Sequence, residues 1–237
     1  MKIDNIQLHS FLRSQDITYF HHANTVATAI SFIRNGGLVS RSDIERLGAF
    51  QTKQESDPED KQYDVWGDVF LDTVDLHGFF PRQNLYGPVL FKFNIDFLLH
   101  ENLDIWITKT NPMFWIPNMS SNERYFQGMS DILLNWNNFD RQRKMITIRK
   151  PYHPVLFKYL EEIVLDDPGV QIYDETILYD VAHASLSIEL NNVQLPLTLL
   201  TKRHCSGCFC QDNYLRQLTI EKLISLFLAP QHKHWRN

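Results

Sequence analysis

The chain has 237 residues, of which 43% are hydrophobic and 13% aromatic, and its formal net charge is −5. This composition is rich enough for a packed core and excludes a globally disordered chain. The acidic balance argues against a tight, nonspecific nucleic-acid binder but is compatible with an enzyme that has a local basic groove. No apolar run reaches the roughly 18 residues of a membrane span, and the first residues lack a signal-peptide pattern, so we expect a cytoplasmic protein.

The first predicted elements are an extended segment over residues 17–23 and the helix that follows it. Asn24 or Thr25 can cap this helix, and Gly36-Gly37 provide its left-handed stop. Its apolar side chains recur at the spacing i, i+3, i+4, i+7: Val26, Ala29, Ile30 and Ile33. The polar stretch 51–64 has no periodicity, so we predict a long surface loop there, and loops of this length are often functional.

Beyond this loop the chain is predicted to contain mostly strands, with helices between them. The strands are expected at 65–74, 87–95, 103–108, 144–149, 161–165 and 185–190, and the helices at 122–136 and 214–228. Because strands and long helices do not alternate regularly, the pattern favours an α+β fold with a mixed or antiparallel sheet and flanking helices. We expect one domain over 1–237, with a core of about 17–190 and the segment 200–230 packed on it.

A cluster of acidic residues ends in a histidine: Asp68, Asp72, Asp75 and His77. Carboxylates with an imidazole could hold a hard divalent metal, and a metal-dependent nuclease is therefore one hypothesis for this chain. On a strand, Asp75 points away from the other two carboxylates, so a common site needs a bend near Val74. The alternative interpretation is a set of capping and turn residues around a buried strand.

The clearest basic stretch, 141–150, includes Arg141, Arg143 and Arg149. These side chains could follow a phosphate backbone, or they could belong to a solvated strand and loop.

The three cysteines lie close together, at Cys205, Cys208 and Cys210, and His204 precedes them. An odd, tightly clustered set is not a disulfide framework. Thiolates at this spacing could share a zinc ion or remain reduced structural thiols. The histidines that could complete four ligands are His204, His183, His232 and His234.

The stretch 17–41 resembles the first motif of ADP-ribosyltransferases, and in particular that of DarT-like toxins, which modify nucleic acid with NAD. In that family a histidine-containing strand leads through an asparagine to a helix that ends in Gly-Gly-Leu. The matching residues are His21 or His22, Asn24 and the NGGL of 35–38. The likeness continues more loosely to about residue 165.

This resemblance implies an ADP-ribosyltransferase-like fold and an enzyme of the glycosyltransferase class that uses NAD as its substrate. The implied target is a base of single-stranded DNA or RNA. The resemblance also implies a toxin of a toxin–antitoxin or phage-defence system, with a cognate antitoxin protein as its partner.

The same resemblance implies roles for single residues. The implied NAD-binding residues are His21, His22, Asn24 and Gly37. Arg41 would clamp the diphosphate or orient the target, because a guanidinium binds phosphate oxygens in pairs. The segment 51–64 would cover the site, and Arg141, Arg143 and Arg149 would receive the nucleic acid.

The sequence departs from the family at the catalytic glutamate, whose position corresponds to Lys144. One explanation is a shifted alignment, with the acid at Glu161, Glu162, Glu175 or Glu189. A second is that transfer activity has been lost, which leaves a non-enzymatic binding module that uses 141–150 for a partner. A third is that the acid has been replaced to silence a toxic enzyme.

Overall fold

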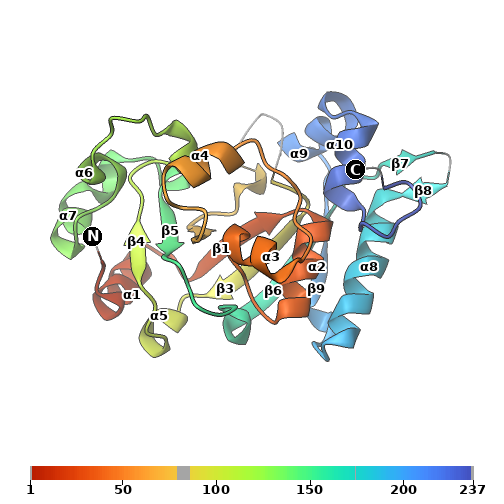
Figure 1. Cartoon of the computed structure of the whole chain (residues 1–237). Coiled ribbons are helices and arrows are strands. Elements are labelled where there is room, and N and C mark those ends of the chain that lie inside the picture. Colours follow the sequence, from red (N-terminus) through yellow and green to blue (C-terminus); the bar gives the residue numbers. More distant parts are fainter. Residues whose placement is uncertain (1, 79–85, 174, 236–237) are drawn as a thin grey trace.

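The computed structural model describes residues 2–78, 86–173 and 175–235, without the side chain of Gln142. Within these ranges seven strands form one sheet in the order β4-β5-β2-β1-β3-β6-β9 (Figure 1). Neighbouring strands are antiparallel except for the parallel pair β6 and β9. The strands are β1 (Tyr19–Asn24), β2 (Val69–Asp72), β3 (Val89–Asn94), β4 (Ile105–Ile107), β5 (Met145–Ile148), β6 (Leu160–Asp167) and β9 (Leu200–His204). A separate ribbon pairs β7 (Gln171–Ile172) with β8 (Thr176–Ile177).

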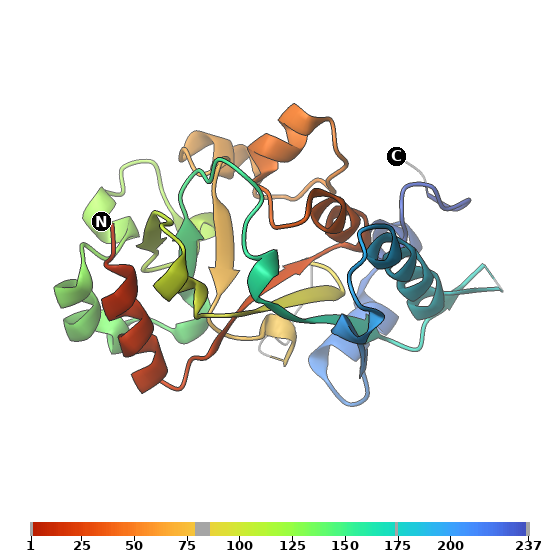
Figure 2. The same cartoon turned by 90° about the horizontal axis from the view of Figure 1, so that it is seen from below.

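Groups of helices lie at both ends of this sheet. They are α1 (Asn5–Ser14), α2 (Val26–Asn35), α3 (Arg41–Leu47), α4 (Asp57–Gln62), α5 (Phe97–His100), α6 (Ser121–Arg124), α7 (Met129–Asn135), α8 (Leu178–Asn192), α9 (Phe209–Asp212) and α10 (Ile220–Phe227). Both views place α1, α6 and α7 at one end of the sheet and α8 to α10 at the other (Figures 1 and 2). The predicted α+β class with a mixed sheet and flanking helices is confirmed. None of the helices in the described ranges combines the length and the apolar character needed to cross a bilayer.

The junction between β1 and α2 agrees closely with the sequence prediction. Thr25 is the N-cap, and its hydroxyl accepts a hydrogen bond from the backbone N–H of Thr28. Gly36 ends the helix with φ of 69°, a left-handed conformation that glycine adopts without a steric cost. The residues Val26–Ile33 are all buried, so α2 is a central helix that the rest of the fold covers on every side.

Several predicted elements differ from the structure. The segment 185–190 is part of α8, and its buried residues Leu186, Glu189 and Leu190 follow helical spacing, so the strand prediction there is wrong. The helix predicted at 122–136 is interrupted between α6 and α7, where Tyr125 bridges to Thr108. The predicted helix 214–228 begins only at α10, after a π-helical turn over 213–217.

The stretch 51–64 is only partly a loop, because it contains α4, whose first turn includes a proline. The elements α1 and β9 were not predicted. β9 has only five residues and no apolar alternation, whereas α1 has ten residues with helical apolar spacing at Leu8, Phe11 and Leu12, which the sequence analysis did not use.

Candidate functional site

A pocket with a volume of about 200 Å³ lies where β1 and β2 meet α2, α3 and the segment 51–66. Its polar wall includes His22 and Asn24 from β1, Arg41 from α3 and Asp72 from the end of β2. Trp66, Phe70 and Met113 are among the apolar side chains that line it. Such a combination of an apolar wall with a few converging polar groups is typical of a small-molecule site.

His22 is held as a neutral imidazole in this wall. Its Nδ1 lies 2.8 Å from the carbonyl oxygen of Phe70, and because a carbonyl only accepts, the proton is on Nδ1. Burial lowers the pKa of His22 to about 4. Its Nε2 is therefore an acceptor, and it lies 3.4 Å from Nδ2 of Asn24.

One side-chain contact and one backbone contact hold Asn24 in place. Its Oδ1 accepts a hydrogen bond of 2.9 Å from the N–H of Thr25, at the start of α2. Gly87, with φ of +118°, packs so closely that a Cβ there would lie 2.4 Å from the carbonyl carbon of Asn24. The conformation and the close approach both require glycine, which keeps Asn24 in place at the pocket wall.

Arg41 connects the pocket to the segment 51–64. Its Nη2 donates to Asp57 Oδ2 at 2.8 Å and to the carbonyl oxygen of Thr52 at 3.1 Å. The guanidinium also lies 5.0 Å from the centre of the Trp66 ring. Its Nε is buried and has no hydrogen-bond partner within the described ranges.

Asp72 lines the pocket at the point where it pairs with His21 of β1, and its carboxyl group has no counter-ion in the described ranges. It is 8% exposed, and within the described part of the chain no cation forms an ion pair with it. Burial, together with the charge of Asp75, raises the pKa of Asp72 to about 8. A carboxyl group with a pKa in this range can exchange a proton near neutral pH, as a general base must.

Two of the residues predicted to bind NAD lie outside the pocket. His21 occupies the opposite face of β1, as the alternation of side chains along a strand requires. Gly37 packs against the backbone of Val155, and a Cβ there would lie 2.7 Å from the Val155 nitrogen. The structure therefore gives Gly37 a packing role at the Leu38–Val155 bridge.

Lys144, at the position of the family glutamate, is 2% exposed and does not line the pocket. Its Nζ donates to the carbonyl oxygens of Trp136 at 2.9 Å and Phe139 at 2.6 Å. Burial lowers the pKa of Lys144 to about 8. This side chain anchors the turn before β5. The glutamates considered as alternative acids do not line the pocket either: Glu161, Glu162, Glu175 and Glu189.

The three arginines of the basic stretch have different environments. Arg149 forms ion pairs with Asp68 and Asp64, so its charge is already neutralised. Arg141 is exposed and donates to the carbonyl oxygen of Thr73 at 3.2 Å. Arg143 is exposed, and its guanidinium lies 5.2 Å from the centre of the Phe114 ring.

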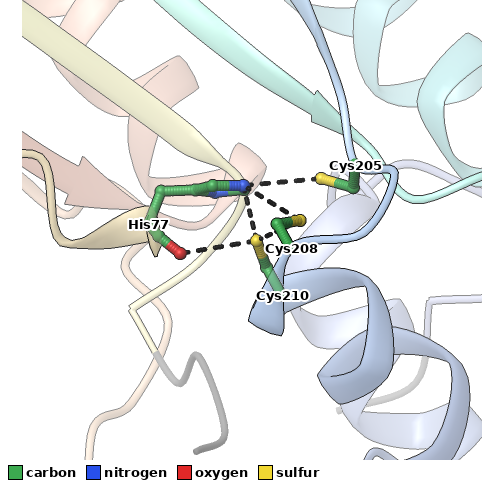
Figure 3. Close-up of side chains that lie close together, drawn as sticks. All are labelled: His77, Cys205, Cys208 and Cys210. Atoms are coloured by element: carbon green, nitrogen blue, oxygen red, sulfur yellow. Dashed lines mark hydrogen bonds between the residues drawn. The ribbon is translucent and has the colours of Figure 1, made fainter. Parts of the chain in front are cut away.

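The structure does not bring Asp68, Asp72, Asp75 and His77 together as metal ligands. Asp68 pairs with Arg149, and Asp75 pairs with Arg203. In the ranges that the structure describes, His77 instead clusters with Cys205, Cys208 and Cys210 (Figure 3). The histidine beside the thiols is therefore His77, and not one of the four that the sequence analysis considered, His183, His204, His232 and His234.

Sequence reasoning missed two features of these sites. Asp72 was considered as a metal ligand, whereas the structure makes it a buried lining residue of the pocket without an ion-pair partner in the described ranges. His77 was separated from the cysteines by more than 120 residues, and no local pattern could connect them.

No family model and no curated protein matches this sequence. Among solved structures, DarTG of Thermosipho africanus in complex with ADP-ribose matches 78% of this chain at 13% identity, with a TM-score of 0.48. This match covers 50% of the DarTG chain, so the present chain spans about half of its length. DarT of Thermus sp. 2.9, in complex with ADP-ribosylated single-stranded DNA, matches 80% of this chain at 10% identity, with a TM-score of 0.49 and 94% of its own chain covered. These structural neighbours are DarT and DarTG proteins, as the sequence resemblance predicts.

The buried carboxyl of Asp72 predicts a specific dependence of stability on pH. Because its folded-state pKa is raised from 3.8 to about 8, the protonated group stabilises the fold at low pH, and this contribution is lost as the pH rises through about 8. We expect Asp72→Asn to remove the loss of stability that the wild type shows as the pH rises. The free energy of unfolding of the variant, relative to the wild type, should therefore rise between pH 5 and pH 8 by roughly 1 kcal/mol or more.

Chemical denaturation at a series of pH values measures this difference. Asp140→Asn, at an exposed aspartate, is the matched control and should follow the pH dependence of the wild type. Parallel stability curves for the wild type and Asp72→Asn would contradict a buried, unpaired carboxyl.

Proposed function

We propose that this chain is an ADP-ribosyltransferase that binds NAD in the pocket and transfers ADP-ribose to a base of single-stranded DNA or RNA. The observation that carries the proposal is that one pocket is lined by Asp72 and by three residues of the resemblance to DarT-like toxins, His22, Asn24 and Arg41. We further propose a cytoplasmic toxin of a toxin–antitoxin or phage-defence system, held inactive by a cognate antitoxin. The modification of an essential nucleic acid requires such control.

The polar groups of the pocket suit the two halves of NAD. The free Nε–H of Arg41 and the N-terminal turn of α2 favour an anion, which places the diphosphate between them. The acceptor Nε2 of His22 suits a ribose hydroxyl or the nicotinamide amide. Trp66 and Phe70 offer apolar surface for a ring.

Transfer requires one bond to break and one to form at C1′ of the nicotinamide ribose. The C1′–N bond breaks, and nicotinamide leaves with its electron pair, so a positive charge develops on the ribose. A nucleophilic atom of the target base then bonds to C1′ and loses its proton. The deprotonated form of Asp72 would stabilise this positive charge as a carboxylate and accept the proton.

Asp72 also offers an explanation for the lysine at 144, the position that corresponds to the catalytic glutamate of DarT-like toxins. The two positions lie on adjacent strands, because Asp72 pairs with Met145, the neighbour of Lys144. A carboxyl group on β2 thus lies one strand away from the position of the family glutamate, on the face that Asp72 shares with Met145. We propose that the carboxyl group has moved to the neighbouring strand, while Lys144 took over a structural role.

The target nucleic acid would approach along the short helical turn Pro112–Phe114. Asn111, Pro112 and Met113 line the pocket, and Phe114 is 43% exposed next to them. Arg143 lies over the ring of Phe114. An exposed aromatic ring beside an arginine can stack a base and contact its phosphate, the combination that single-stranded nucleic acids require.

The two histidines of β1 provide a matched test of NAD binding. His22→Phe removes the acceptor Nε2 at similar volume, and we expect about a tenfold loss of NAD affinity, the equivalent of one hydrogen bond. His21→Phe makes the same change on the opposite face of the strand and should leave the affinity unchanged. Isothermal calorimetry measures both. Equal effects of the two changes, with both variants folded by circular dichroism, would exclude this pocket as the NAD site.

The reaction is tested with labelled NAD and separate pools of single-stranded DNA, RNA and protein. We expect label on one nucleic-acid pool together with release of nicotinamide. Asp72→Asn should lower the transfer rate by about 10²- to 10⁴-fold, the usual effect of losing a general base. Glu55→Gln is the control, because Glu55 also lines the pocket but is exposed.

The outcome also separates the alternatives. NAD binding without any transfer would favour a non-enzymatic binding module. Cleavage of nucleic acid that depends on magnesium and not on NAD would favour the nuclease hypothesis.

Arg143 tests the approach of the nucleic acid. Arg143→Ala should weaken binding of a single-stranded oligonucleotide and reduce the slope of log affinity against log salt concentration by about one unit. NAD affinity should stay the same. Arg216→Ala is the matched control, since Arg216 is also exposed and paired with a nearby aspartate. A salt slope that does not change in Arg143→Ala would place the nucleic acid elsewhere.

A further inference from the structure

Four side chains from two distant parts of the sequence meet beside the sheet (Figure 3). His77 lies in the short helical turn Leu76–Gly78 after β2, Cys205 follows β9, and Cys208 and Cys210 lie at the start of α9. Their ligand atoms all lie within 4.8 Å of one another. We propose that they bind one zinc ion as a structural site with three cysteine ligands and one histidine ligand.

The separations between His77 and two of the cysteines fit a tetrahedral zinc site. With Zn–S of about 2.3 Å and Zn–N of about 2.0 Å, the edge between a nitrogen and a sulfur ligand is roughly 3.5 Å. His77 Nε2 lies 3.6 Å from Cys205 Sγ and 3.7 Å from Cys208 Sγ. Cys210 Sγ is closer, at 2.5 Å from His77 Nε2 and 2.9 Å from Cys208 Sγ, so it would move outward on binding. Cys210 lies in a single helical turn that can accommodate such a shift.

The ligand types select a particular class of metal. Three sulfurs and an imidazole suit zinc, whereas magnesium and calcium prefer oxygen ligands. Cys205 is 3% exposed and Cys210 is 1% exposed, so the site is largely closed to solvent. Four protein ligands leave no position for water or substrate, which is the pattern of a structural zinc site.

A second layer of contacts orients the imidazole. Asp166 Oδ2 lies 2.8 Å from His77 Nδ1, which places the proton on Nδ1 and turns the free Nε2 toward the sulfurs. Asp166 is fully buried and is itself held by Arg203 Nε at 2.7 Å and by the Tyr214 hydroxyl at 3.0 Å. A carboxylate behind a histidine is a frequent support for a zinc ligand.

The backbone supports the same arrangement. Gly207, with φ of +72°, reverses the chain between Cys205 and Cys208, which allows both sulfurs to point to one side. The N–H of Cys205 donates to the carbonyl oxygen of Asp167 at 2.9 Å, so the turn is attached to the end of β6. A pair of thiols that formed a disulfide would need neither the imidazole nor its carboxylate.

The ion would connect two parts of the fold that are distant in sequence. His77 follows the pocket residue Asp72 by five positions, and the cysteines begin the helical C-terminal region. Zinc would thus fix the segment that leaves the pocket wall against β9 and α9. Such a site stabilises folding directly, because the ligands are separated in the unfolded chain.

The experiment uses the purified full chain and needs neither NAD nor nucleic acid. Elemental analysis should find about one zinc per chain. After exchange with cobalt(II), visible absorption should show tetrahedral coordination with thiolate charge-transfer bands. His77→Ala should lose the metal or bind it at least about tenfold more weakly. His204→Ala, at an exposed histidine next to Cys205, is the matched control and should keep full metal content.

A second variant distinguishes the loss of a metal ligand from misfolding of the chain. His77→Cys retains four ligands and should bind cobalt with stronger charge-transfer absorption than the wild type. The proposal is overturned if the chain contains no zinc and takes up no cobalt. It is also overturned if His77→Ala retains the wild-type spectrum, or if mass spectrometry of the untreated chain shows a Cys208–Cys210 disulfide.

Discussion

The alternation of side chains along β1 is the constraint on which the rest of the site depends. β1 lies between β2 and β3, so its register with both neighbours is fixed. One face of the strand directs His22 into the pocket, and the other directs His21 away from it. A shift of one residue would exchange the two histidines and would also move the start of α2. Asn24 ends the strand and Thr25 caps the helix, so the strand, the helix and the pocket wall share one short segment.

Burial and ion pairing together determine which charged groups of the pocket can bind a ligand or exchange a proton. Asp68 is buried beside Arg149, and this ion pair leaves little charge for a ligand. Asp72 is also buried but has no such cation within the described ranges, and burial together with the charge of Asp75 raises its pKa to about 8. An unpaired buried carboxyl costs stability, and groups of this kind are found most often where function requires them. Arg41 is paired with Asp57 but keeps an Nε–H without a partner in the described ranges, whereas the ammonium of Lys144 donates to two carbonyl oxygens.

Local sequence signals predicted the elements whose causes are local. The cap at Thr25, the apolar spacing of α2 and the stop at Gly36 lie within twelve residues, and the structure has all three where the sequence indicates them. The segment 185–190 alternates like a strand, but its long-range packing favours the helix α8. The pairing of Asp68 with Arg149 and the approach of His77 to the cysteines join residues that are far apart in sequence. Such contacts depend on the sheet order and could not be read from spacing.

A crystal structure with a non-cleavable NAD analogue tests most directly whether NAD lies between β1, β2 and α3. We expect the nicotinamide ribose between His22 and Asp72, with the diphosphate in hydrogen-bond contact with Arg41 Nε. Density for the analogue elsewhere on the protein, or in the pocket without contact to these three side chains, would contradict the account.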